Sequence, residues 1–311
     1  MPEIAVICED GGVGALAWAA GVEVRWFALR RFEVPVLPPG TPELRVLHLS
    51  DLHLLPGQRR KIDWVRSLAD LEPDLVVTTG DNIAHDDALP ALLHAYEGLL
   101  ERPGAFVLGS NDYFAPRFKN PARYLLPDAR EDRPQPRALP WQDMVAAFRD
   151  AGWKDLTNRR DVVELGPAGT VVSLVGVDDA HLDRDRFPAS TRGQHAAGPH
   201  ALHPPPDLRL GVTHAPYRRV LDAMHADGSD LVLAGHTHGG QLCVPVLGAL
   251  TTNCDLDVRR AKGLHGWPGP RPDEPDGAGS SWLHVSAGLG TSPFAPVRFA
   301  CRPEASLLTL V

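Results

Sequence analysis

Short β-type apolar runs alternate with helically spaced apolar positions along the N-terminal part of the sequence. The runs are rich in Val and Leu, and the stretches between them place apolar residues such as Ile62, Val65 and Leu68 on one helical face. The pattern predicts strands at residues 44–49, 74–79 and 105–108 and helices at 58–71 and 86–100. This order is typical of a parallel sheet covered by helices, so the expected fold class is α/β.

β-type runs dominate the rest of the sequence, after a segment rich in Pro and Arg. The predicted elements are strands at residues 162–165, 170–177, 208–213, 230–234, 282–286 and 306–311, and helices at 141–151 and 217–225. The first two of these strands flank Gly166-Pro167-Ala168-Gly169, which predicts a hairpin. Residues 44–311 are expected to form one domain, with loop insertions at about 113–140 and 252–281.

Residues 1–43 are expected to form an N-terminal extension. The stretch from Gly11 to Val22 is almost wholly apolar, but a membrane-spanning helix needs roughly 18 or more apolar residues. Glu9 and Asp10 stand where a secretory signal would carry positive charge. Residues 13–31 therefore have two interpretations, an amphipathic helix on a membrane surface or a helix packed against the domain.

Composition narrows the class of partner. The chain has 311 residues and a formal net charge of −8, which argues against broad electrostatic binding to nucleic acid and against a nuclease. Its four cysteines show neither CxxC spacing nor a disulfide framework: Cys8, Cys243, Cys254 and Cys301. Buried, reduced thiols fit a reducing compartment. The predicted location is therefore the cytoplasm, with the inner membrane surface as an alternative. No protein partner can be inferred.

Polar clusters follow the predicted strands in a regular order. The clusters are Asp51-Leu52-His53, Gly80-Asp81-Asn82, Gly109-Ser110-Asn111-Asp112, His214 and Gly235-His236-Thr237-His238. Side chains at the carboxyl ends of neighbouring strands share one crevice, so residues far apart in sequence can converge there. Each cluster alone is weak evidence, since an isolated Asp-x-His or Gly-Asp is common in loops. Together they predict a dinuclear metal centre.

The residue types suggest how two ions would be shared. Asp81 is expected to bridge them with its two carboxylate oxygens. The first ion is expected to bind Asp51, His53 and His238, and the second Asn111, His214 and His236. This mixture of carboxylate and imidazole suits Mn, Fe or Zn rather than Ca, and the lack of cysteine ligands argues against structural zinc.

Such a centre predicts phosphate chemistry. Two divalent ions would outweigh the Asp51 and Asp81 carboxylates and leave a positive patch that attracts phosphate. Ions roughly 3.5 to 4 Å apart can also generate a bridging hydroxide and stabilise charge on phosphorus during in-line attack. The predicted function is a metal-dependent phosphohydrolase, and within that class a phosphodiesterase or pyrophosphatase.

The same motifs resemble the calcineurin-like metallophosphoesterase superfamily, and the resemblance covers residues 44–311. It implies a four-layer αββα sandwich that hydrolyses phosphate monoesters, diesters or pyrophosphates. Gly239-Gly240-Gln241, together with the stretch from Gly288-Leu289-Gly290-Thr291 to Arg298, resembles a bacterial branch that includes UDP-diacylglucosamine pyrophosphatase-like enzymes. The implied substrate is a phosphate-containing small molecule or a lipid-linked one.

One motif departs from the family pattern. The usual Gly-Asn-His-Asp binds metal through Asn and helps to protonate the leaving group through His, but this chain reads Gly109-Ser110-Asn111-Asp112. Ser110 and Asn111 are alternative metal ligands, and Asn111 is favoured because an amide oxygen is the better neutral ligand. Without the acid, which is commonly worth about 10² to 10⁴-fold, activated diesters or pyrophosphates should be preferred. The residues expected to take part in catalysis are Asp81, Asn111, Asp112 and His236.

Residues around this centre have competing interpretations. Asp112 is expected to hold Asn111 or His236 from behind, and Asn82 orients Asp81, contacts substrate or caps a turn. The loop at 113–140 is either a lid that holds phosphate through its arginines or a solvated loop. His48 is expected to be a core residue, and these histidines are expected to be structural or exposed: His85, His181, His195, His200, His203, His225, His265 and His284. The alternative function is a catalytically weak binding scaffold.

Overall fold

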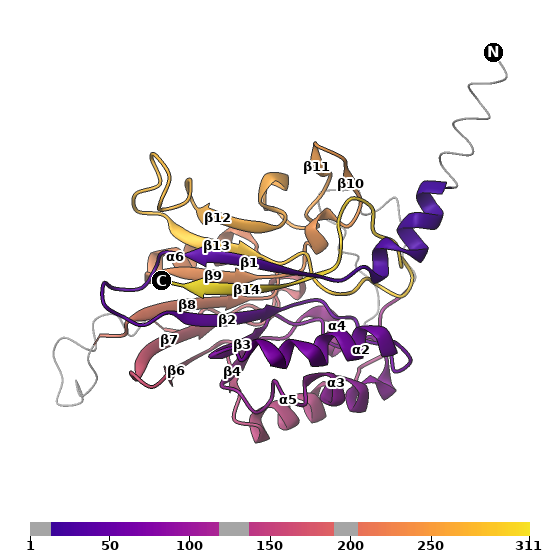
Figure 1. The fold of residues 1–311 in the computed structure, drawn as a ribbon, viewed down its shortest axis with the longest axis horizontal. Coiled ribbons are helices and arrows are strands. Elements are labelled where there is room, and N and C mark those ends of the chain that lie inside the picture. The colour runs from indigo at the N-terminus through magenta and orange to yellow at the C-terminus, as the bar shows by residue number, and fades with distance from the viewer. Residues whose placement is uncertain (1–13, 118–136, 190–204) are drawn as a thin grey trace, which may run out of the picture.

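The computed structural model describes residues 14–117, 137–189 and 205–311. Two six-stranded sheets pack face to face, and helices cover both outer faces (Figure 1). The first sheet has the order β1 (Ala28–Val34), β14 (Glu304–Leu310), β2 (Leu44–Leu49), β3 (Leu75–Thr78), β4 (Gly104–Phe106) and β5 (Lys154–Asp155). The second has the order β12 (Gly263–Trp267), β13 (Ser281–Val285), β9 (Leu231–Ala234), β8 (Leu208–Thr213), β7 (Thr170–Gly176) and β6 (Arg159–Leu165).

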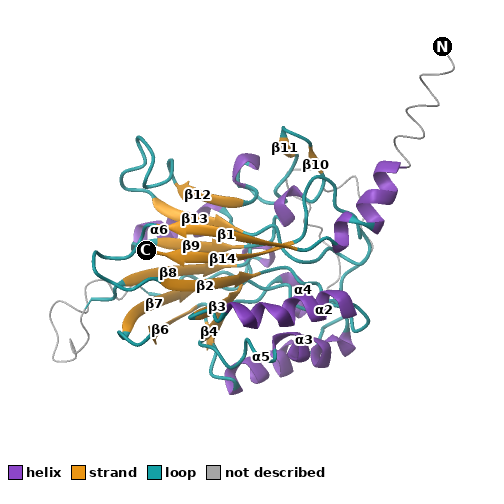
Figure 2. Cartoon of the chain, in the orientation of Figure 1, coloured by secondary structure: helices purple, strands orange, loops and turns teal. Residues whose placement is uncertain are grey.

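The helices complete a four-layer sandwich, which confirms the expected fold class (Figure 2). Those against the first sheet are α2 (Arg59–Arg66), α3 (Leu89–Tyr96) and α5 (Trp141–Asp150), and α6 (Arg218–Asp227) packs on the second. Shorter elements lie in the connections: η1 (Glu23–Arg25), η2 (Ser67–Leu71), η3 (Asp86–Ala88), α4 (Ser110–Tyr113), η5 (Ala180–Leu182), η6 (His238–Gly240), β10 (Cys243–Val244), β11 (Gly248–Ala249) and η7 (Val258–Arg260).

Alternation along the strands places apolar side chains in separate cores on the two faces of each sheet. On β2, Leu47 and Leu49 pack toward the helices, whereas Leu44 and Val46 pack between the two sheets. Successive strand side chains point to opposite faces, so one strand serves two cores. Leu283 on β13 packs instead in a third core, beneath α6. The unbroken apolar runs of the sequence follow from this burial of both sheet faces.

The direction of the strands places the polar clusters at one edge of the two sheets. Strands β2, β3 and β4 are parallel neighbours in the first sheet, and β7, β8 and β9 are parallel neighbours in the second. The predicted hairpin is confirmed as the antiparallel pair β6 and β7, with Val163 opposite Val172. The polar clusters follow the carboxyl ends of these parallel strands, where open α/β sheets bind ligands.

The N-terminal region differs from the expected extension. Residues 28–34 form β1, which pairs in parallel with β14, so the first sheet begins upstream of residue 44. The predicted helix at 13–31 is described only as a short helix at residues 14–21, near the N-terminal end of the drawn chain (Figure 1). Its Ala19 is buried and accepts a hydrogen bond from the backbone N–H of Arg298, so this end of the helix packs against the domain. No helix in the described part of the chain is both long and apolar enough to cross a membrane.

The two predicted loop insertions also differ from simple loops. The stretch at 252–281 contains β12, an edge strand that pairs antiparallel with β13. Most of the stretch at 113–140 lies outside the described residues. Its two ends meet in a bridge between Phe114 and Ala138, so it enters and leaves the fold at one place.

Candidate metal centre

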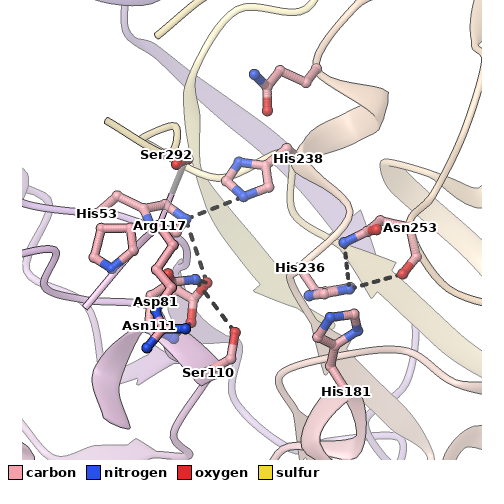
Figure 3. Close-up of a pocket in the computed structure, with 12 residues that line it drawn as sticks. His53, Asp81, Ser110, Asn111, Arg117, His181, His236, His238, Asn253 and Ser292 are labelled. Atoms are coloured by element: carbon pink, nitrogen blue, oxygen red, sulfur yellow. Dashed lines mark hydrogen bonds and ion pairs between the residues drawn. The ribbon is translucent and has the colours of Figure 1, made fainter. Parts of the chain in front are cut away.

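Two groups of side chains meet at the carboxyl ends of the parallel strands (Figure 3). In the first group, the Nε2 atoms of His53 and His238 lie 3.2 Å apart, and His238 Nε2 lies 3.7 Å from Asp51 Oδ1. In the second group, His236 Nδ1 lies 3.3 Å from His214 Nε2. Asp51 with His53 and His238 could hold a metal ion, as could Asp51 with Asp81 and His214.

Asp81 lies between the two groups. Its Oδ2 is 3.4 Å from His53 Nε2, and its Oδ1 is 3.7 Å from His214 Nε2. Each carboxylate oxygen therefore faces an imidazole of a different group. This is the placement that a carboxylate shared by two cations requires.

The backbone at these side chains is unusual. Five of them have positive φ: Asp51 (50°), His53 (41°), Asp81 (55°), His236 (68°) and His238 (50°). Asp and His adopt this left-handed region more readily than most residues, but each instance still costs about 1 to 3 kcal/mol. Backbone hydrogen bonds hold the strained turns, from Asp51 N to Gly80 O and from His53 N to Asp81 O, each 2.9 Å. The strained conformation turns the side chains toward a common pocket.

Two motif glycines make room for this convergence. A Cβ on Gly235 would lie 1.9 Å from Ser50 Oγ, and one on Gly109 would lie 2.3 Å from Asp81 Oδ1. Both distances are far below contact distance, and the atoms involved are packed around the site. Glycine is therefore required so that these loops can approach Asp51 and Asp81 closely.

Three imidazoles each have one ring nitrogen beside a backbone carbonyl. His214 Nδ1 lies 2.8 Å from Thr79 O, His236 Nε2 lies 3.2 Å from Asn253 O, and His238 Nδ1 lies 3.2 Å from Gly290 O. In each ring the other nitrogen points into the site, and His236 Nε2 and His238 Nδ1 also lie 3.4 Å from Asn253 Nδ2 and Arg298 Nη2. Metal-binding histidines are commonly held in this way.

The electrostatics fit divalent cations. Burial lowers the pKa of His53 and His238 to about 3, so both rings are neutral, as metal binding requires. Asp51 Oδ1 is buried and has no hydrogen-bond partner among the described residues. An orphaned carboxylate oxygen beside neutral imidazole rings is unfavourable unless a cation lies among them. The donor set therefore fits the expected ions.

His214 behaves differently from the other imidazoles. Burial alone would lower its pKa, but the neighbouring Asp81, Asp179 and Asp51 carboxylates outweigh burial and raise the pKa to about 9. In the metal-free protein the His214 ring is therefore an imidazolium that compensates these carboxylates. A divalent cation can take over this compensation and displace the proton.

Asn111 and Ser110 both line the pocket, at the start of α4. Asn111 reaches Asp81 twice: its backbone N–H donates to Oδ1 at 2.8 Å, and its Nδ2 donates to Oδ2 at 2.7 Å. Ser110 Oγ lies 3.4 Å from Asn111 Nδ2. Asn111 is therefore the residue of this pair whose side chain lies against the shared carboxylate.

Asp112 plays a different part from the one expected. It is fully buried and accepts backbone N–H groups from Asp81 at 2.8 Å, Asn82 at 2.7 Å and Gly109 at 2.9 Å, rather than holding the side chain of Asn111 or His236. It thus ties together the turns after β3 and β4. Asn82 is also buried, and its Oδ1 accepts from Thr78 Oγ1, so it lies behind the site rather than in it.

His181 is a pocket residue that the sequence analysis placed among structural or exposed histidines. Its ring centroid lies 4.7 Å from that of His236, and its Nδ1 lies 3.1 Å from Tyr217 Oη. It follows β7, another strand that ends at the site edge. The polar run Asp178-Asp179-Ala180-His181 after that strand was the signal that could have revealed it.

Other side chains complete the pocket wall. These are Pro116, Arg117, Gln241, Asn253 and Ser292. Arg117 comes from the described beginning of the loop at 113–140, but Lys119, Arg123, Arg130 and Arg133 lie outside the described residues. The pocket therefore contains a cation from this segment, close to where a phosphate would meet the two groups.

Comparison with known proteins agrees with this geometry. The family model "Calcineurin-like phosphoesterase" matches residues 44–240. Phosphodiesterase YaeI of Escherichia coli (strain K12) is 24% identical over 312 residues, covering 99% of this chain and 96% of that protein. The uncharacterized metallophosphoesterase YkoQ of Bacillus subtilis (strain 168) is 27% identical, covering 86% and 83%. The solved structure of TT1561 from Thermus thermophilus aligns at a TM-score of 0.41 with 14% identity, covering 80% and 91%.

The matched segment begins with β2 and ends just after His238, so it spans every motif that contributes to the two groups. Relatives along almost the whole chain are named as a phosphodiesterase and a metallophosphoesterase. The chain therefore belongs to the calcineurin-like phosphoesterase family and is a metal-dependent phosphoric ester hydrolase.

Proposed function

We propose that the protein is a dinuclear phosphodiesterase or pyrophosphatase. The observation that carries the proposal is the position of Asp81, whose two carboxylate oxygens face His53 at 3.4 Å and His214 at 3.7 Å. One ion would be held by Asp51, His53 and His238, a second by Asn111, His214 and His236, and both by Asp81. Mn, Fe and Zn suit these donors.

When bound, the two ions would supply an activated water and positive charge for the phosphoryl oxygens. Residues of the pocket would bind and orient the substrate. Arg117 lines the pocket and is placed to bind a phosphoryl oxygen that faces away from the ions. His236 and Asn111, held by Asn253 O and by Asp81, also line this pocket.

The leaving group determines the substrate class. Asn111 stands where the family motif carries its proton-donating His, so an alkoxide would leave without that help. We therefore expect aryl diesters and pyrophosphates to be hydrolysed faster than alkyl esters, by roughly the 10² to 10⁴-fold that general acids supply. Matched aryl and alkyl diesters, assayed at saturating concentration, test this, and equal kcat values contradict it.

A lipid-linked substrate and contact with the inner membrane surface are part of the proposal. The helix at residues 14–21 carries no charged residue, and Leu16 and Trp18 are 62% and 42% exposed. Trp18, Trp26 and Arg60 line one shallow pocket, and Arg302 stacks over Trp26 at 4.0 Å. Exposed indoles beside arginines suit the interface of an anionic bilayer.

Sedimentation with phosphatidylglycerol and phosphatidylcholine vesicles tests membrane contact. The double variant Leu16→Ser and Trp18→Ser should lose binding to anionic vesicles, while Val162→Ser, an exposed apolar position on β6, should keep it. No binding by the unchanged protein would remove this part of the proposal. That result would not affect the proposal that the protein is a hydrolase.

The hydrolase itself is tested with nucleotide-diphospho-lipids, cyclic nucleotides and aryl phosphodiesters, each with Mn, Zn, Fe and Mg. Activity that requires metal and is abolished in Asp81→Ala supports the proposal. A folded protein that binds no metal and hydrolyses none of these substrates would instead support the binding-scaffold alternative. Metal content by mass spectrometry distinguishes one ion from two.

A further inference from the structure

Two buried histidines meet between the sheets. His48 on β2 and His284 on β13 are both fully buried, and their Nδ1 atoms lie 2.9 Å apart. They are separated by 236 positions in sequence and belong to different sheets. Their surroundings are the apolar core formed by residues such as Val46 and Trp282. Polar groups are rarely buried in such a core without a partner.

Hydrogen bonds lead from this pair to the metal centre. His48 Nε2 lies 3.0 Å from Thr79 Oγ1, which donates to Ser50 Oγ at 2.7 Å. Ser50 Oγ donates in turn to Asp51 Oδ2 at 2.5 Å. The chain therefore ends on one oxygen of a carboxylate in the first group.

The direction of every hydrogen bond in this chain is fixed. A hydroxyl has one hydrogen, and those of Ser50 and Thr79 are both used toward Asp51, so Thr79 must accept from His48 Nε2–H. A neutral His48 then has a bare Nδ1, which must accept from His284 Nδ1–H. This leaves His284 Nε2 without a proton. His284 Nε2 is buried and has no hydrogen-bond partner among the described residues.

Both rings are neutral, as this order requires. Burial lowers the pKa of His48 to about 3 and that of His284 well below its usual value. Four donors thus point one way, and aligned hydrogen bonds polarise one another. The hydroxyl of Ser50 is therefore a strong hydrogen-bond donor to Asp51 Oδ2.

We propose that His284, His48, Thr79 and Ser50 are positioning residues that aim Asp51 Oδ1 at the cation. Oδ2 is occupied by Ser50 Oγ and by the backbone N–H of His236 at 3.0 Å, so Oδ1 is the oxygen that faces His238. This series of hydrogen bonds runs from the interior of the sandwich to Asp51 and fixes the rotation of the Asp51 carboxylate. This inference rests on the proposed function only in treating the occupant of that site as a metal ion.

Thr79→Val tests the inference because it keeps the side-chain shape but removes both hydrogen bonds at the middle of the chain. Mn²⁺ is titrated into chelator-treated protein, and binding is followed by calorimetry and by the electron paramagnetic resonance of free Mn²⁺. The affinity of one site should fall by about 10 to 100-fold, as is typical when groups behind a ligand are removed. Thr79→Ser keeps the hydroxyl and should restore the affinity.

Thr170→Val is the matched control. Thr170 is also buried but lies at the first residue of β7, at the end of the strand away from the site, so its Mn²⁺ affinity should match the unchanged protein. Equal affinity in Thr79→Val and the unchanged protein overturns the inference. If Thr79→Val does not fold, Ser50→Ala decides by the same criterion. Failure of the unchanged protein to bind Mn²⁺ would count instead against the proposed function.

Discussion

Two histidine pairs in this protein have similar geometry and different surroundings. His48 and His284 lie 2.9 Å apart between the sheets, and His53 and His238 lie 3.2 Å apart at the pocket. Burial lowers the pKa of His48, His53 and His238 alike to about 3. The members of the first pair are held in regular strands, whereas both members of the second have positive φ.

The difference lies in what satisfies the rings. In the core pair a proton joins the two Nδ1 atoms, and the bond continues through His48 to Thr79. In the pocket pair, His238 Nδ1 lies 3.2 Å from Gly290 O, and its Nε2 faces His53 and lies 3.7 Å from Asp51 Oδ1. Two close imidazoles are therefore no sign of a metal site by themselves. The neighbouring Asp51 carboxylate marks the pocket pair as the one placed to hold an ion.

The largest expected effect comes from removing one ring of each pair. His238→Ala should lower kcat/KM by more than about 100-fold, because a direct ligand should matter more than the groups behind it, whose loss costs about 10 to 100-fold. His284→Phe should lower it far less. Steady-state assays with an aryl diester measure both variants, and equal losses would break the comparison.

Mn²⁺ should stabilise the folded protein through the pocket pair of histidines and not through the core pair. A chelator should abolish activity, and restoring Mn²⁺ at about 100 times its Kd should stabilise the folded state by about 2.7 kcal/mol. Thermal unfolding with and without Mn²⁺ measures this effect. His238→Ala should show a smaller gain than the unchanged protein, and His284→Phe a gain close to it. The same gain in His238→Ala would contradict the assignment of this ring.

The pH dependence of the metal-free protein sharpens the comparison through His214. The pKa of His214 is about 9 in the folded protein and 6.5 in the ordinary state. Its contribution to the stability of the folded protein is therefore fully present below pH 6.5 and is lost as the pH rises through about 9. The difference corresponds to about 3 kcal/mol. The unfolding free energy of the unchanged protein minus that of His214→Gln should therefore decrease from pH 6.5 to about 9. A flat difference in urea titrations excludes the imidazolium.

The smallest expected effect is at the far end of the core pair. His284→Phe removes only the first donor of the hydrogen-bonded series, four hydrogen bonds away from Asp51, so Mn²⁺ affinity should fall by less than about 10-fold and by less than in Thr79→Val. Calorimetric titration ranks the two variants. A larger loss in His284→Phe would mean that packing between the sheets, rather than donor order, controls Asp51.

Much of the fold was predictable because its signals are local. β2 has the bounds expected from residues 44–49, and the hairpin of β6 and β7 forms around Gly166-Pro167-Ala168-Gly169. The four-layer arrangement came from the resemblance rather than from periodicity. β1 and β12 were missed, because an edge strand exposed on one side has weaker apolar patterning than the buried strands.

For the site, the sequence by itself determined which residue types follow each strand, and parallel strand ends bring such residues together in any fold of this class. Only the tertiary structure decided which nitrogen of each ring faces the site, that His181 joins the pocket, and that Asp112 holds backbone rather than side chains. It also decided that His48 reaches His284 across the two sheets. The physical reason is that tautomers, left-handed turns and contacts between sheets depend on neighbours distant in sequence, whereas strand and ligand spacing depend on neighbours along the chain.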